Sequence, residues 1–108
     1  MRLRYLATAE PGLRWFRRYY RKNQQLNLAK AIGALRRAEA TLGEFPFTGE
    51  VYEDFEVVRE QEILGTAFSL LYTVARDTVW VIDLRDQRGQ RSAESLRRCL
   101  DDLRRRPL

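Results

Sequence analysis

Apolar and polar residues alternate at the start of the chain and then change to a helical spacing. Leu3, Tyr5 and Ala7 alternate with the residues between them over residues 2–7, which predicts a short first strand. Thr8 is a candidate N-cap for the helix that follows. Arginines cover most of that helix, and its apolar face consists of Leu13, Phe16 and Tyr20.

A second helix is predicted after the polar break at residues 23–25, because large apolar residues again recur at helical spacing. These residues are Leu28, Ile32, Leu35 and Leu42. Gly43 is the residue at which this helix is expected to end. Together the two segments have the pattern of an antiparallel helix hairpin.

Turn residues and extended segments follow the helices. Residues 45–49 contain Pro46 and Gly49, which break the helical pattern. Residues 51–63 are rich in β-branched and aromatic side chains and are predicted to form one strand, too charged to be buried on both faces.

Two more strands are predicted on either side of a tight reversal at residues 76–78. One side of the first strand is formed by Phe68, Leu70, Tyr72 and Val74. In the second, Val79 and Val81 oppose a set on the other side made of Trp80, Ile82 and Leu84. Apolar residues on both sides are typical of a central strand.

A last helix is predicted after Ser92 as its N-cap, with Leu96, Leu100 and Leu103 on one side. The predicted order is therefore β-α-α-β-β-β-α. It indicates an α+β fold in which a twisted, mainly antiparallel sheet packs against the helix hairpin. With 108 residues and no linker, the chain is expected to form one domain over residues 1–108.

Composition excludes several classes of protein. A hydrophobic content of 44% with 32% charged residues is typical of a soluble globular domain. No apolar run approaches the roughly 18 residues that a membrane span needs. No long apolar region follows the basic start, so no secretion signal is indicated and a cytoplasmic location is expected. We expect no membrane partner.

The chain has no histidine, and its single cysteine is Cys99. An internal disulfide is therefore excluded, and a zinc site is not expected. The missing imidazole also removes the usual general base near neutral pH. We expect no metal and no other cofactor, and any catalysis would depend on Arg, Lys, Tyr or carboxylates.

The net charge of +5 is unevenly distributed along the sequence. Residues 1–37 carry ten basic and one acidic side chain, residues 38–84 carry two basic and ten acidic, and residues 85–108 carry eight basic and four acidic. This segregation predicts two basic surfaces and an acidic one. Eighteen of the twenty basic residues are arginine. That bias suits forked hydrogen bonding to an anionic partner, and a GC-rich genome is an equally good explanation of it.

Arginines follow the last predicted strand at a spacing of three: Arg85, Arg88 and Arg91. At a strand end they could converge on phosphate oxygens or on another anionic target. The alternative is a solvated loop whose arginines pair with Asp83 and Asp86, and spacing alone favours it because arginine runs are usually solvated.

Arg59 and Tyr72 are further candidates for target binding. Arg59 stands on a strand dominated by acids, where it either belongs to a binding surface or pairs with Glu60 and Glu62. Tyr72 is in line with Phe68 and Leu70, so its ring is expected in the core with its hydroxyl reaching the surface, and a catalytic hydroxyl is the minority interpretation.

In order and spacing, these segments resemble the RelE/ParE superfamily of bacterial type II toxins. The resemblance covers nearly the whole chain. It depends on the opening strand with the arginine-rich helix pair, the turn Phe45–Gly49, Val58–Glu60, Phe68–Tyr72, and the hydrophobic strand that leads to Asp86–Arg88. It implies a small toxin, a role in growth inhibition and plasmid stabilisation, and a cognate antitoxin that wraps and blocks it.

Two activities divide this superfamily. RelE-like members cut messenger RNA in the ribosomal A site with Arg, Lys and Tyr residues, whereas ParE-like members poison DNA gyrase. RelE-like members carry an arginine just after the aromatic residue of the third strand, where this chain has Ser69. They usually place lysines on the preceding strand, where it has Glu60 and Glu62.

Two further differences from RelE-like members also favour the ParE-like side. RelE-like members often have a tyrosine in the last segment, and residues 89–108 contain none. Only Arg88 or Arg91 matches the arginine that they carry after the last strand. Cleavage of RNA needs a base, an acid and cationic stabilisation of the phosphate, and carboxylates on this strand would repel it.

The sequence therefore favours a ParE-like toxin that binds gyrase, with Arg59, Arg85, Arg88 and Arg91 as ionic contacts. A RelE-like endoribonuclease acting on ribosome-bound messenger RNA is the alternative. A plain RNA- or DNA-binding module is a third hypothesis. Assembly as a homodimer or as a heterotetramer with the antitoxin is left open.

Overall fold

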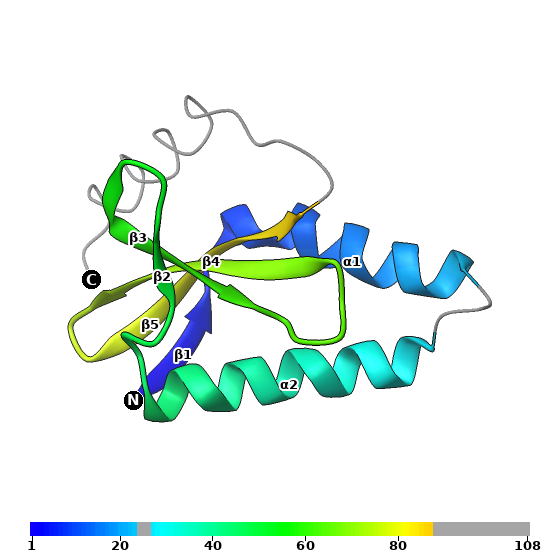
Figure 1. Ribbon diagram of the computed structural model, residues 1–108, viewed down its shortest axis with the longest axis horizontal. Coiled ribbons are helices and arrows are strands. Elements are labelled where there is room, and N and C mark those ends of the chain that lie inside the picture. Colours follow the sequence, from blue (N-terminus) through cyan, green and yellow to red (C-terminus); the bar gives the residue numbers. More distant parts are fainter. Residues whose placement is uncertain (24–26, 88–108) are drawn as a thin grey trace.

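A five-stranded sheet carries two helices on one face in the computed structural model, which describes residues 1–23 and 27–87 (Figure 1). The strands are β1 (Arg2–Tyr5), β2 (Glu50–Tyr52), β3 (Phe55–Glu62), β4 (Phe68–Ala75) and β5 (Thr78–Asp86). The helices are α1 (Glu10–Lys22) and α2 (Leu28–Glu44), and a 3₁₀ turn (Ala7–Ala9) precedes α1. The α+β class, the mainly antiparallel sheet and the helix pair agree with the prediction.

The strand order across the sheet is β1-β5-β4-β3-β2. β1 pairs with β5 in parallel, and the other neighbours pair antiparallel. β1 is thus an outer strand, on which Arg2 and Arg4 are exposed. Charged side chains on an outer strand discourage pairing with another chain.

The main core lies between the helices and one face of the sheet. The fully buried Phe16 of α1 meets Phe68 of β4 edge to face, with ring centroids 5.0 Å apart. The other large side chains of this core are those of Tyr20, Leu35, Leu42, Ile63, Leu70, Tyr72, Val79, Val81 and Leu84. The predicted apolar faces of both helices and of β4 therefore build one core. Burial of these side chains is the main stabilising contribution.

A second, smaller apolar cluster occupies the opposite face of the sheet. It contains Leu6, Tyr52, Val58, Leu71 and Ile82. A β-bulge in β5 separates Ile82 from Leu84: Tyr72 pairs with Val81, whereas Leu71 pairs with Asp83. The prediction that Leu84 shares a side with Trp80 and Ile82 was wrong, because one extra residue moves it to the helix side.

The predicted strand at residues 51–63 is in fact two strands, β2 and β3, which form a hairpin. Its turn passes through Glu53 at φ 49°, a left-handed conformation that few residues other than glycine adopt. The hairpin stands at the end of the molecule opposite the point where α1 finishes and α2 begins (Figure 1).

Thr8 does not cap α1. The residue before α1 is Ala9, and the Thr8 hydroxyl instead donates to the carbonyl oxygen of Ile82 at 2.7 Å. The predicted final helix, Cys99, Arg88 and Arg91 lie outside the described residues. Within residues 1–23 and 27–87, no helix is both long enough and apolar enough to cross a membrane.

Candidate functional site

Arg59 lies on the helix-facing side of the sheet, where it is the cross-strand partner of Tyr72. Its Nη1 donates to the carbonyl oxygen of Gly49 at 2.7 Å and to that of Phe47 at 3.3 Å. Its guanidinium also lies 5.5 Å from the centre of the Phe47 ring. The arginine therefore fixes the turn before β2, and its predicted neighbours Glu60 and Glu62 are not its partners.

Tyr72 is fully buried, and its hydroxyl oxygen accepts a hydrogen bond from the Gly49 amide at 2.9 Å. Burial raises the pKa of Tyr72, against the opposing effects of the Gly49 hydrogen bond and the nearby Arg59 charge. The phenol therefore keeps its proton near neutral pH. The ring lies in the core as predicted, but the prediction that the hydroxyl reaches the surface was wrong, because the turn at Gly49 covers it.

Gly49 has to be glycine because the chain approaches Tyr72 closely. A Cβ atom there would lie 2.6 Å from the Tyr72 hydroxyl oxygen and 2.8 Å from the carbonyl oxygen of Glu60. Both distances are shorter than normal van der Waals contact. The sequence pattern predicted Gly49 only as a turn residue, and the close contact with β3 and β4 was not predicted.

Arg85 points to the opposite face of the sheet from Arg59. Its cross-strand partner is Ser69, which alternates with the buried Phe68 and Leu70 of the helix side. Arg59 and Arg85 are thus separated by the sheet and do not form one surface. This position follows from the period of two along a strand.

Arg85 holds a carboxylate rather than facing open solvent. Its Nη1 donates to Glu60 Oε2 at 2.8 Å, and the Ser69 hydroxyl donates to the same oxygen. Its guanidinium lies 5.6 Å from the centre of the Tyr52 ring. The hydrogen bond to Glu60 raises the pKa of Arg85, despite the opposing effect of burial. Arg85 therefore pairs with Glu60, which is 25 positions away in the chain, and not with Asp83 or Asp86 as suggested by the sequence.

From the sequence, Glu60 was expected to be a surface charge, and Ser69 and Arg85 were not expected to be its partners. The β3–β4 register brings Glu60 opposite Leu71 and places Ser69 opposite Glu62. Alternation along β3, β4 and β5 indicates which residues of each strand share a face. The pairing of the strands, which brings these residues together, is not visible in the sequence.

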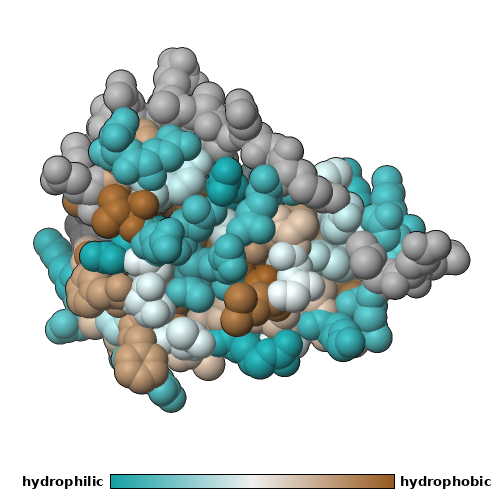
Figure 2. Space-filling view, viewed as in Figure 1, coloured by the Kyte–Doolittle hydropathy of each residue, from teal (hydrophilic) through white to brown (hydrophobic). Residues whose placement is uncertain are grey.

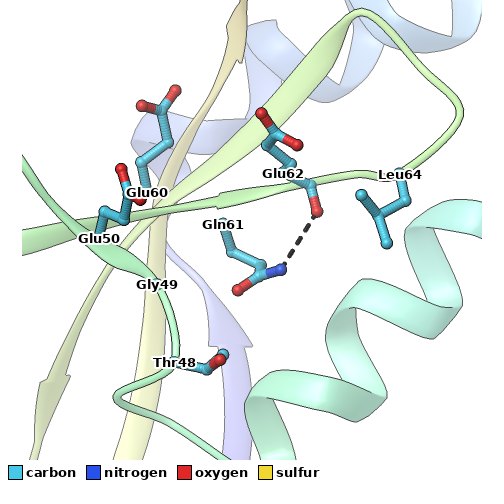
Figure 3. Close-up of a pocket in the computed structure, with 7 residues that line it drawn as sticks. All are labelled: Thr48, Gly49, Glu50, Glu60, Gln61, Glu62 and Leu64. Carbon is cyan, nitrogen blue, oxygen red and sulfur yellow. Dashed lines mark hydrogen bonds between the residues drawn. The ribbon is translucent and has the colours of Figure 1, made fainter.

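Three glutamates are among the residues that line an open hollow beside the outer edge of β3. Figure 3 shows Glu50, Glu60 and Glu62 directed to the same side, while Gln61 points away from them. The hollow has a volume of about 290 Å³. Among the described residues, no group of three His, Cys, Asp or Glu side chains is arranged to hold a metal ion.

Cations gather on the surface of α1 instead. Helix α1 has Phe16 and Tyr20 buried against the sheet, while five of its basic side chains are exposed. They are Arg14, Arg17, Arg18, Arg21 and Lys22. Trp15 lies among them, 46% exposed, with its Nε1 donating to Asp86 Oδ2 at 3.2 Å. Much of the face drawn in Figure 2 is likewise hydrophilic, with hydrophobic spots scattered on it.

No known protein-family model matches this chain, and no curated protein sequence matches it either. The resemblance to RelE/ParE toxins is thus a matter of segment order and spacing in this sequence. The function of this protein therefore depends on the chemistry of its own residues.

Proposed function

We propose that the chain is a ParE-like toxin of a bacterial type II toxin–antitoxin module. In this proposal it inhibits DNA gyrase by binding it, and a cognate antitoxin neutralises it. The resemblance in segment order supports this choice of family, and the geometry of the sheet favours binding over catalysis.

The observation that carries the proposal is the position of Glu60. A site that cleaves RNA needs cations around the scissile phosphate and groups that transfer protons. On the sheet face opposite the helices, the Glu60 carboxylate accepts hydrogen bonds from both Ser69 and Arg85. Arg85 is therefore already paired with an anion of its own chain. Glu62, two residues along β3, adds a second negative charge to the same side. This environment repels a phosphate backbone.

The other candidate catalytic side chains also form hydrogen bonds within the fold. Arg59 is bonded to two main-chain carbonyl groups, and the Tyr72 hydroxyl is buried against Gly49. These contacts suit a rigid scaffold that acts by holding its target. Ionic contact with gyrase then depends on basic groups at the surface, and Arg88 and Arg91 stay the predicted contacts.

Binding to nucleic acid without toxicity is a second candidate function, which the surface of α1 favours. Its arginines could contact phosphates while the half-exposed Trp15 ring stacks on a base. Such binding would weaken steeply with salt. Ribosome-dependent cleavage of messenger RNA stays the enzymatic alternative.

Induction of the chain in bacteria tests the proposal. We expect growth inhibition with gyrase-linked DNA breaks and no new messenger ends at ribosomal A sites. The R88A/R91A double variant should lose growth inhibition and keep the thermal unfolding transition of the wild type. The R2A/R4A variant, altered at two exposed arginines of β1, is the matched control and should stay toxic. A-site cuts without gyrase damage would contradict the proposal, and so would toxicity of R88A/R91A.

A further inference from the structure

Leu64 separates two hollows of opposite charge. This side chain is 73% exposed, the largest exposed fraction among the large hydrophobic residues that the structure describes. On one side it borders the hollow lined by Glu50, Glu60 and Glu62, which we call the acidic hollow. On the other it borders a hollow of about 380 Å³ lined by Lys30 and Arg37, which we call the basic hollow.

The acidic hollow lies where β3 extends beyond its neighbour β2. The last cross-strand pair between them is Glu50 with Glu60, so no described strand covers Glu62 on that side. The amide of Ile63 donates to Phe68 in the direction of β4, and the backbone groups of Glu62 therefore point outward. Only the Gln61 side chain reaches the Glu62 carbonyl, at 3.4 Å, which is a weak hydrogen bond (Figure 3). A free strand edge of this kind can accept a further strand.

The charges of the acidic hollow are available to a partner. Glu50 and Glu62 are exposed, and the structure gives neither of them an ion-pair partner among the residues it describes. Glu60 is shared with Arg85. The two exposed carboxylates therefore attract a cationic side chain.

The basic hollow has the opposite chemistry over an apolar floor. Lys30 and Arg37 are exposed on α2, and neither has a carboxylate partner in the described part of the chain. Ala31, Ala34 and Tyr20 are buried beneath them. Small alanine side chains leave room for an incoming group. This hollow suits a carboxylate carried on a short apolar stem.

We propose that the two hollows and Leu64 together bind one extended segment of a partner protein. The segment adds a strand along the free edge of β3 at Glu62. It places a cationic side chain beside Glu50 and Glu62, an apolar side chain on Leu64, and an acidic side chain between Lys30 and Arg37. Side chains alternate along a strand, so one segment can address both sides of the edge.

The size and charge of the surface favour a peptide over a small molecule. Each hollow is at or near the lower end of the roughly 300–1,000 Å³ that ligand pockets span. Two open hollows with an exposed apolar residue between them match side chains of opposite charge on one backbone. In the function proposed above, this partner would be the antitoxin. The inference rests on that function for the identity of the partner alone, because the binding surface is defined without it.

Peptide selection tests this inference without any assay of toxicity. A random 12-residue peptide library displayed on phage is selected against the purified full chain, and affinities of synthetic copies are then measured. We expect enriched peptides to carry a basic, an apolar and an acidic residue. L64S should weaken their binding at least tenfold. V57S, at an exposed valine of β3, is the matched control and should change it by less than twofold.

A charge-swapped variant sharpens the test. E50K/E62K/K30E/R37E should lose the peptides selected on the wild type and bind peptides in which the two charges are exchanged. Binding should also slow hydrogen exchange at the Glu62 amide in the wild type. Circular dichroism and thermal unfolding establish that each variant is folded.

Several outcomes would overturn the inference. They are an absence of enriched peptides, equal affinity for L64S and the wild type, full binding by peptides of a single charge, and unchanged exchange at Glu62. A chain that binds such peptides but does not inhibit growth would refute the proposed toxin and leave this surface intact. A toxic chain that fails the peptide test would do the reverse.

Discussion

Arg85 donates a hydrogen bond to Glu60 at 2.8 Å across the middle strand of the sheet. An arginine that the sequence assigned to target binding thus holds a carboxylate of its own chain. With Ser69 bonded to the same oxygen, the pair forms a polar cluster beside the second apolar cluster. Arg85 and Ser69 therefore both depend on the charge of Glu60.

Replacement of Glu60 should destabilise the fold. Both side chains of the pair are about one quarter exposed or less, at 26% for Arg85 and 22% for Glu60. E60Q should lower the free energy of unfolding by about 1–3 kcal/mol, because Arg85 and Ser69 lose a charged acceptor. Urea unfolding measures this change. The control is E62Q at an exposed position, which should change stability by less than about 0.5 kcal/mol.

A double-mutant cycle distinguishes the pair from a general loss of charge. Combination of E60Q with R85Q should give a coupling energy of about 0.5–3 kcal/mol. Additive effects would mean that the two side chains do not interact in solution.

Tyr72→Phe separates a structural phenol from a catalytic one. Removal of the hydroxyl leaves the Gly49 amide without its buried acceptor, so we expect a loss of about 1–3 kcal/mol in unfolding free energy. Growth inhibition should persist in cells that hold the folded variant. Full stability combined with loss of toxicity would instead give the Tyr72 hydroxyl a direct role at the target, as the catalytic interpretation requires.

Arg59 should act on the turn at residues 47–49. A hydrogen bond from a charged donor contributes about 1.5–3 kcal/mol, so R59A should speed hydrogen exchange at the Gly49 amide by roughly tenfold or more. The R4A variant, at the far edge of the sheet, should leave that rate unchanged. Equal rates in R59A and the wild type would show that the turn does not depend on this arginine.

Stability should fall in alkaline solution because tyrosine pKa values are raised. Burial, followed by the hydrogen bond from Tyr5 to Glu39, raises the pKa of Tyr5 well above its ordinary 10.0, and burial also raises the pKa of Tyr72. The folded state then favours the protonated phenol. Its stabilising contribution is complete below about pH 10 and is lost as the pH rises from there toward the folded-state pKa.

The measurement is the urea midpoint as a function of pH, between about pH 8 and pH 11. The midpoint of Y5F should decline less steeply above about pH 10 than that of the wild type. Identical slopes would mean that Tyr5 does not contribute to the alkaline transition.

Local patterns in the sequence predicted the helices and the middle strand well. Phe16 and Tyr20 lie on the buried face of α1, and Phe68, Leu70 and Tyr72 lie on one side of β4 as expected. These features depend only on spacing within one element. Burial of a continuous apolar face fixes them locally.

Features that depend on distant contacts were not predictable in the same way. The turn at Glu53 uses a positive φ without glycine, and Ile82 is the extra residue of the bulge in β5. The pairing of Arg85 with Glu60 follows from a register across β3, β4 and β5. Sequence spacing carries no record of that register, so the partners suggested for Arg85 were its neighbours along the chain, Asp83 and Asp86.

We propose that this protein acts by holding gyrase and not by cutting RNA. The most direct measurement is supercoiling by purified gyrase with increasing amounts of the purified chain, beside a purified translation reaction on a defined messenger. We predict inhibition of supercoiling that saturates at a fixed ratio of chain to gyrase, and intact messenger. Cleavage of the messenger in translating ribosomes, with supercoiling unaffected, would contradict the claim.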